Sequence, residues 1–133
     1  MKGKILQPPE YADLEGQLIF LAGPIQGSSD WHANAIEIIS KISPEVNIAS
    51  PRRYVGIKYV KGDFTPEMYN EQVDWETHYL NNAAKTGLVM FWLAKEFEHR
   101  CDRAYGQTSR FELGEWKVKH EKDKVKLVIG IEP

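Results

Sequence analysis

The segment TSRFELGEW, residues 108–116, contains a carboxylate that could do chemistry. Glu112 follows Ser109 at the spacing of a helix capping box, in which the serine bonds the amide three residues on and the glutamate reaches back. The same position, near the start of a helix expected over 109–120, puts a carboxylate at the positive end of the helix dipole, which lowers its pKa. An ionised carboxylate can attack the anomeric carbon of a sugar. The pattern therefore leaves two roles open for Glu112, a helix cap and a nucleophile.

A second carboxylate, Glu76, lies in a helix that Thr65 and Pro66 open and that we expect to run to about Ala84. Either Glu76 reaches water from the edge of the apolar face of this helix, or it projects into a cleft. In a cleft, partial burial would raise its pKa toward the range of a general acid. Steps of three and four residues place the following side chains on the same face: Gln72, Trp75, Tyr79, Leu80 and Ala83.

The loop AGPIQGSS, residues 22–29, joins an apolar run to the next helical pattern. Gly23 and Gly27 would let the backbone come close to a ligand. Ser28 and Ser29 offer either the N-cap of the following helix or donors for an anion. The loop matches neither the dinucleotide-binding glycine fingerprint nor a phosphate-binding P-loop, so a plain tight turn is the alternative.

The composition argues against several classes of protein. A formal net charge of −2 supplies no basic field for a nucleic-acid backbone. No apolar run approaches the roughly 20 residues that cross a bilayer. The single Cys101 fits a reducing compartment, and the first residues show no apolar leader. We therefore expect a cytoplasmic protein that has neither a nucleic-acid partner nor a membrane partner.

Other catalytic groups have no pattern in this chain. No catalytic-serine elbow appears. The histidines show no metal-ligand spacing and are expected at the surface: His32, His78, His99 and His120. We expect no metal and no cofactor. The two carboxylates, Glu76 and Glu112, remain as the candidate catalytic groups.

Short apolar runs and amphipathic segments alternate along the chain, as they do in α/β proteins. The order predicts a small three-layer α/β/α sandwich with a mainly parallel sheet of about four to five strands, flavodoxin-like or Rossmann-like. Residues 1–16 are expected to be an N-terminal extension and 17–133 a single domain. We expect strands over 17–22, 46–51, 87–94 and 126–131, and helices over 31–42, 65–84 and 109–120.

Ligands of such sheets bind beyond the carboxyl ends of the strands, where the strand order reverses. The segments that leave those ends are GPIQGSS, PRRYVG and LAKEF…QTSRFE. The chemistry is therefore expected in these three loops and at the helix starts that follow them.

Four segments, IFLAGPI, EQVDWETHYLNNA, GLVMFW and TSRFELGEW, together resemble the nucleoside 2-deoxyribosyltransferase-like family over roughly residues 17–131. The resemblance implies a flavodoxin-like fold and transfer of a 2-deoxyribosyl group between nucleobases, although some relatives hydrolyse the N-glycosidic bond. It implies that Glu112 is the nucleophile and that Glu76, where the family more often has aspartate, is the acid. Two features depart from the family pattern. Phe20 stands where the transferases have an orienting tyrosine, and FWLAKEF lacks their base-binding aspartates.

The expected ligand is a small-molecule nucleoside or nucleotide. Trp31 and Trp92 could each stack on its base, or could pack in the core or at a subunit interface. We expect the following residues to bind the substrate: Gly23, Pro24, Ile25, Trp31, Gln72, Trp92, Ser109 and Arg110.

Two other functions stay open at this point. One is a hydrolase of nucleoside 5′-monophosphates, whose phosphate would lie at helix N-termini beside Ser28, Ser29, Ser109 and Arg110. The other is a module that senses a nucleotide without catalysis.

The aromatic content predicts an assembly. Four tryptophans, six tyrosines and five phenylalanines are many for 133 residues, and a small domain cannot bury them all. We expect the surplus to form the contact of a homodimer or larger homo-oligomer, through the helices that carry Trp75, Tyr79 and Trp116.

Overall fold

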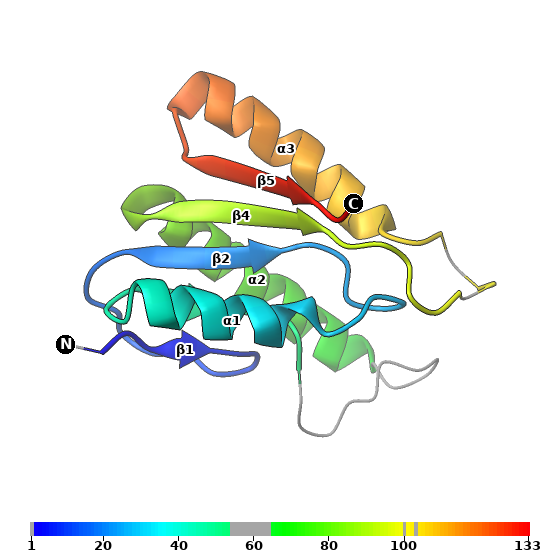
Figure 1. The fold of residues 1–133 in the computed structure, drawn as a ribbon, viewed down its shortest axis with the longest axis horizontal. Helices are drawn as coiled ribbons and strands as arrows, with labels where there is room; N and C mark the ends of the chain where they lie inside the picture. The colour runs from blue at the N-terminus through cyan, green and yellow to red at the C-terminus, as the bar shows by residue number, and fades with distance from the viewer. Residues whose placement is uncertain (1, 54–64, 100, 103) are drawn as a thin grey trace.

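The computed structural model of the chain describes residues 2–53, 65–99, 101–102 and 104–133. Within them, five parallel strands form one sheet in the order β1-β3-β2-β4-β5 (Figure 1). Of the loop PRRYVG expected at the site, residues 54–56 lie outside the described residues. The strands are β1 Ile5–Leu6, β2 Leu18–Ala22, β3 Asn47–Ala49, β4 Leu88–Leu93 and β5 Leu127–Ile131, and the helices are α1 Trp31–Ile42, α2 Pro66–Thr86 and α3 Gln107–Asp123.

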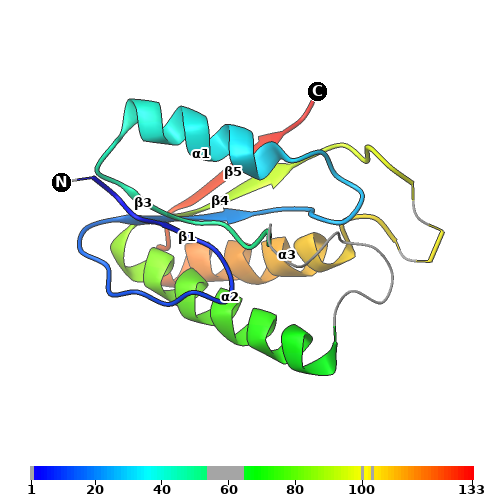
Figure 2. The ribbon, with the colours of Figure 1, turned by 90° about the horizontal axis from the view of Figure 1, so that it is seen from below.

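The three layers predicted from the alternation of elements are present. Helix α1 covers one face of the sheet, and α2 and α3 lie side by side on the other (Figure 2). This is the small flavodoxin-like α/β sandwich that the pattern predicts.

The sheet contains one strand that the periodicity did not reveal. β1 is only two residues long and pairs with β3, with Ile5 opposite Ile48. It comes from the segment expected to be an extension. The residues that follow it pack on α2, where the Trp75 indole donates to the Glu10 carbonyl (2.7 Å) and the Ala12 amide donates to the Tyr79 hydroxyl (3.0 Å). Part of the predicted extension therefore completes one edge of the sheet and covers α2.

The helix starts differ in how well the capping residues predicted them. Thr65 caps α2 as expected, since its side chain accepts from the Met68 amide (3.1 Å). Helix α1 is capped by Asp30, which accepts from the Ala33 amide, rather than by either serine of the preceding loop. Helix α3 begins at Gln107 after Gly106, which has a φ of 65° and makes no side-chain cap. Because α3 starts before Ser109, the capping-box interpretation is wrong.

The core divides between the two faces of the sheet. The face under α2 and α3 holds the larger cluster, and the face under α1 holds a smaller one that includes Trp31. In the larger cluster Trp75 and Tyr79 are fully buried and Trp116 nearly so. These three aromatic side chains therefore belong to the core of the single chain. They are not exposed on its surface, where the expected subunit contact would need them.

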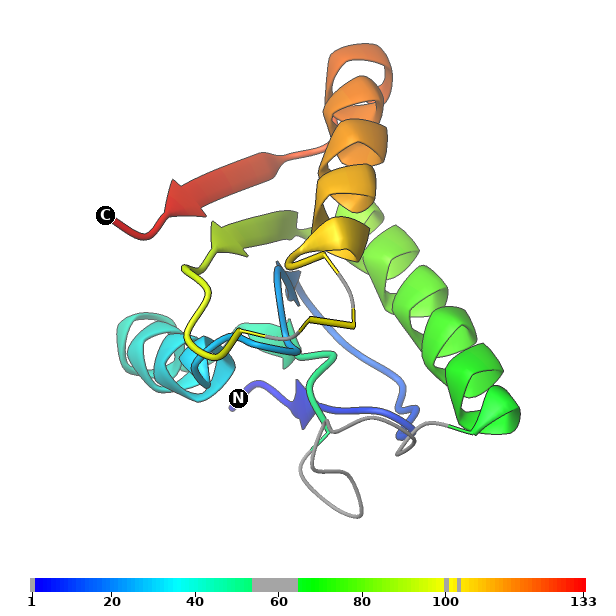
Figure 3. The same ribbon diagram turned by 90° about the vertical axis from the view of Figure 1, so that its right-hand side faces the viewer.

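The strand order places a crevice at the carboxyl ends of β2 and β4. From β2 the chain turns toward β3 on one side, and from β4 it turns toward β5 on the other, so the connections leave in opposite directions. Figure 3 looks toward these carboxyl ends, where the loops after β2 and β4 meet the start of α3. None of the helices in the described ranges is both long and apolar enough to cross a membrane.

Candidate active site

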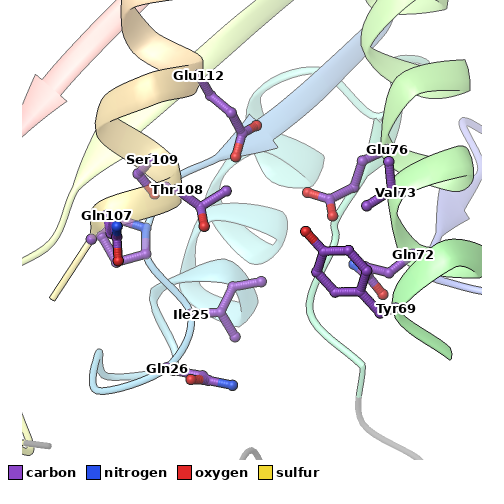
Figure 4. Close-up of a pocket in the computed structure, with 13 residues that line it drawn as sticks. Ile25, Gln26, Tyr69, Gln72, Val73, Glu76, Gln107, Thr108, Ser109 and Glu112 are labelled. Atoms are coloured by element: carbon purple, nitrogen blue, oxygen red, sulfur yellow. The ribbon is translucent and has the colours of Figure 1, made fainter. Parts of the chain in front are cut away.

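A cavity of about 300 Å³ opens at this crevice, between α2 and α3 (Figure 4). Three elements line it: the loop after β2, one face of α2 and the first turns of α3. The lining residues are Gly23, Pro24, Ile25, Gln26, Tyr69, Gln72, Val73, Glu76, Gly106, Gln107, Thr108, Ser109 and Glu112.

Glu76 and Glu112 project into this cavity from opposite walls, one from α2 and one from α3 (Figure 4). They lie 36 positions apart in the chain. The fold brings them together because α2 and α3 are neighbours on the same face of the sheet. The expected pair of carboxylates is therefore gathered in one site.

Both carboxyls are held far from their ordinary titration range. Burial, and then the nearby charge of Glu115, raise the pKa of Glu112 to about 7. Burial and then the charge of Glu112 raise the pKa of Glu76 to about 8, against the opposing effects of a hydrogen bond from Gln72 and the positive charge of Arg53. Near neutral pH, Glu112 is thus the more readily ionised of the two, and Glu76 keeps its proton.

The direction of the Glu112 shift differs from the expectation. A helix N-terminus should have lowered the pKa of Glu112, but α3 begins at Gln107, and the dipole effect fades within the first turn. Glu112 lies in the second turn, where burial between the two helices outweighs it. The raised pKa of Glu76 agrees with the cleft interpretation and not with an edge open to water.

Two residues of the α2 wall were not anticipated. Tyr69 and Val73 line the cavity beside Gln72 and Glu76, about two turns and one turn before Glu76 respectively. The signal that could have found them is their spacing from Glu76, at i−7 and i−3 on the same helical face. Both are exposed, because the cavity is open on this side. Tyr69 therefore presents a free aromatic ring to the space between the helices (Figure 4).

The loop after β2 forms the floor, and its shape depends on Gly23. This residue has a φ of 153°, and a Cβ there would lie 2.3 Å from the Trp92 carbonyl oxygen and 2.7 Å from the Trp31 ring. The Trp31 indole donates to the Pro24 carbonyl (2.9 Å) from beneath. The backbone of the loop thus reaches the cavity because no side chain at position 23 pushes it outward.

The two tryptophans expected to wall the base do not line the cavity. Trp31 is buried in the cluster under α1, and Trp92 packs against the same cluster on the far face of the sheet. For these residues the core-packing interpretation holds. Phe20 is also a core residue, fully buried with its ring 6.0 Å from that of Trp75.

The residues proposed to bind phosphate are not gathered at the cavity. Among them only Ser109 lines it. The Ser28 hydroxyl lies 3.0 Å from the Pro24 and Ile25 carbonyl oxygens and accepts a hydrogen bond from Arg52, so it holds the loop together. Arg110 is exposed and donates to the Tyr105 carbonyl instead. The wall of α3 also contains Gly106, Gln107 and Thr108, which sequence reasoning had not singled out.

One of the four histidines departs from the surface position expected of it. His32 is fully buried, stacks on Trp31 with ring centroids 3.7 Å apart, and accepts from the Arg52 guanidinium. Burial, and then Arg52, lower its pKa well below the usual range. It packs under the loop and does not line the cavity. In the described part of the chain, no group of His, Cys, Asp and Glu side chains could hold a metal ion.

A model of the family described as "Nucleoside 2-deoxyribosyltransferase like" matches residues 16–130. The chain belongs to this family. A search of the curated proteins gave no match. Membership of the nucleoside 2-deoxyribosyltransferase-like family indicates an enzyme that acts on small-molecule nucleosides by glycosyl transfer or N-glycoside cleavage. The two facing carboxyls are the groups of this site that suit such chemistry.

Proposed function

We propose that the protein transfers a 2-deoxyribosyl group between nucleobases by double displacement. The observation that carries the proposal is the pair of facing carboxyls, one with a pKa of about 7 and the other with a pKa of about 8. Two titratable groups whose environments separate their pKa values are suited to divide the roles of nucleophile and acid. Glu112 takes the first role and Glu76 the second.

In the first half-reaction, a carboxylate oxygen of Glu112 attacks C1′ of the bound deoxynucleoside. The C1′–N bond breaks, its electron pair leaves with the base, and the proton of Glu76 passes to the departing base. The products are a free base, an ester between Glu112 and the sugar, and an ionised Glu76.

In the second half-reaction, the acceptor base attacks C1′ and gives its proton to the Glu76 carboxylate. The ester C1′–O bond breaks, and its electrons return to Glu112 as a carboxylate. This is the retaining logic of two carboxyl groups applied to an N-glycoside. Water in place of the acceptor base would make the same site a hydrolase.

The lining of the cavity favours an uncharged nucleoside over a nucleotide. Among the described residues, no lysine or arginine lines it, whereas two carboxyls do. A 5′-phosphate would add negative charge beside Glu112 without a cation to offset it. Apolar contact is available from Tyr69, Val73 and Ile25, which suits the flat faces of a base and a sugar.

Base exchange tests the proposal directly. The purified protein is incubated with a 2′-deoxynucleoside and a different free base, and the products are separated by chromatography. We expect the exchanged deoxynucleoside from the parent protein and none from Glu112→Ala. The matched control is Glu121→Gln, an exposed carboxylate of the same helix that pairs with Lys117, and it should retain full activity.

Other products would point to the other functions. Free deoxyribose without exchange would mean a hydrolase. Turnover of a 5′-monophosphate in preference to the nucleoside would contradict the argument from the charge of the lining. Binding without any turnover would make the chain a sensing module.

A further inference from the structure

Arg53 lies behind the site and not in it. The residue is only 8% exposed, follows β3, and does not line the cavity. Its Nε donates to Oε1 of Gln72 (2.8 Å), and its Nη2 donates to Oε1 of Glu71 (2.7 Å). The guanidinium therefore joins the segment after β3 to two consecutive residues of α2.

The contacts of Gln72 leave its amide only one orientation. An arginine can only donate, so the amide oxygen must face Arg53. A carbonyl can only accept, so the amide nitrogen must face Pro51, whose oxygen lies 2.9 Å away. The remaining capacity of the amide meets Glu76, one turn further along α2, by a hydrogen bond that favours the ionised carboxyl. The orientation of the Gln72 amide thus decides whether Glu76 receives this hydrogen bond.

Glu76 is held between opposing influences. Burial and the facing charge of Glu112 on α3 favour the protonated carboxyl, and Gln72 and Arg53 favour the ionised one. Among the described residues these are the groups that act on it, together with the Tyr69 hydroxyl, which points into the same space on α2 (Figure 4). Arg53 is the only cation among them, and it acts both through its charge and through Gln72.

We propose that Arg53 is a positioning residue of the site: by fixing the Gln72 amide, it keeps Glu76 able to give up its proton and take it back. The inference rests on the proposed function, because a double displacement needs Glu76 as an acid in the first half-reaction and as a base in the second. Without Arg53, the Glu76 carboxyl is a weaker acid that still protonates the first departing base, but it takes up a proton from solvent once that base has left. In this protonated form it cannot accept the proton of the incoming base or water. The glycosyl ester on Glu112 therefore accumulates.

The test compares Arg53→Met with the parent and with Lys41→Met. The control removes an exposed cation of α1 that pairs with Glu37, so both variants change the net charge equally. Each protein is mixed with a 2′-deoxynucleoside and an acceptor base, and the reaction is quenched at successive times. The mass of the intact protein is then measured by mass spectrometry. In Arg53→Met we expect deglycosylation about tenfold slower or more, glycosylation within about threefold of the parent, and a larger steady fraction of protein carrying one deoxyribosyl group. Lys41→Met should behave as the parent does.

A second readout does not depend on turnover. The side-chain carboxyl carbons of glutamate are labelled with ¹³C and titrated by NMR, and Glu76→Gln identifies the signal. The midpoint of the Glu76 titration, about 8 in the parent, should move to higher pH in Arg53→Met. Arg53→Lys keeps the charge but lacks the planar guanidinium that meets Gln72 and Glu71 through two separate nitrogens, so it should give a shift in the same direction and a smaller one. This variant also carries the test if Arg53→Met does not fold.

The outcomes separate this inference from the proposed function. If the parent forms no adduct and no product, the proposed function is wrong, and the titration alone decides whether Arg53 controls Glu76. An unmoved midpoint overturns the inference whatever the activity. Equal slowing of both half-reactions, with an unchanged midpoint, would show a merely structural role and would also overturn it.

Discussion

Glu112 and Glu76 show how burial can assign different roles to two residues of the same type. The residues next to each glutamate in the sequence do not indicate that its pKa is shifted. Their pKa values are raised because α2 and α3 bury both carboxyls, and that of Glu76 is raised further because Glu112 faces it. The order of the two values follows from the geometry of the cavity, and so does the division of labour that we propose.

Replacement of Glu112 should separate activity from stability. The folded-state pKa of about 7 lies above the unfolded value of about 4.3, so the stability tied to protonation of Glu112 is fully present below pH about 4.3 and is lost as the pH rises from there through about 7. Glu112→Gln removes this titration and caps no helix end. We expect it to abolish sugar transfer and to melt at or above the parent's temperature at pH about 8, by calorimetry. A marked fall in melting temperature there would mean that the carboxylate has a structural role.

The two pKa values also predict a narrow optimum. Activity requires Glu112 ionised and Glu76 protonated, so kcat/KM should rise through pH about 7 and fall through pH about 8. Glu76→Gln should remove the alkaline limb and slow the departure of poor leaving bases more than that of good ones. A profile that stays flat from pH about 6 to 9 would contradict the assignment.

At the scale of elements, the loop after β2 depends on a single glycine. Gly23→Ala would bring a Cβ against the Trp92 carbonyl and the Trp31 ring at a φ that side chains rarely adopt. We expect a loss of about 1–3 kcal/mol in the free energy of unfolding, measured with urea. Gly114→Ala is the matched control, because a Cβ there meets nothing within 4 Å on the exposed side of α3. It should stabilise the protein by about 0.5–1 kcal/mol, and similar losses at both positions would refute the steric argument.

The alternation of elements predicted the sandwich, since each apolar run and each amphipathic segment carries its own period. The pairing of Glu76 with Glu112 could be predicted because both follow from one family pattern. The failure at Trp92 has a different origin. Side chains of a strand alternate between faces, so Trp92 points with Met90 toward α1, while Phe91 points toward α2 and α3. Which helix covers which face is a property of the crossovers, and no local pattern encodes it.

The same limit explains the short strand β1 and the lining residues Tyr69 and Val73. Two residues are too few to show a period, and β1 exists because β3 offers it an open edge. Tyr69 and Val73 look like solvent-facing residues of α2 until α3 is placed beside them. Their roles arise from packing between elements that are distant in the sequence.

At the scale of the whole molecule, the aromatic side chains expected at a subunit contact are buried, and the exposed ones are scattered over other segments: Tyr11, Tyr69, Phe97 and Phe111. A continuous run of exposed apolar side chains lies instead along the edge strand β5, where Val128, Ile129 and Ile131 are exposed. In the described structure β5 ends the sheet and pairs only with β4. A long apolar edge is a template for pairing with another chain. We therefore still predict a homo-oligomer, but we expect β5 of one copy to pair with β5 of a second copy, in place of a contact through the helices.

Light scattering after gel filtration checks this prediction. We expect the parent to be a dimer or larger at micromolar concentration, and Ile131→Lys to be a monomer, because it places a charge on the predicted contact. Ile42→Lys is the control, since Ile42 is as exposed as Ile131 (77% and 69%) but lies at the end of α1. A monomeric parent would refute the assembly, and an oligomer unaffected by Ile131→Lys would refute the β5 contact.

The indole of Trp31 makes the loop visible to fluorescence. Its ring nitrogen is bonded to the carbonyl of Pro24, and Pro24 lines the cavity directly above it. The emission wavelength of an indole depends on its hydrogen bonding and on the polarity around it. A ligand that shifts Pro24 should therefore change the emission of Trp31, and Trp31→Phe should remove that change. Occupancy of the cavity can then be followed optically, in unlabelled protein, before any product has formed.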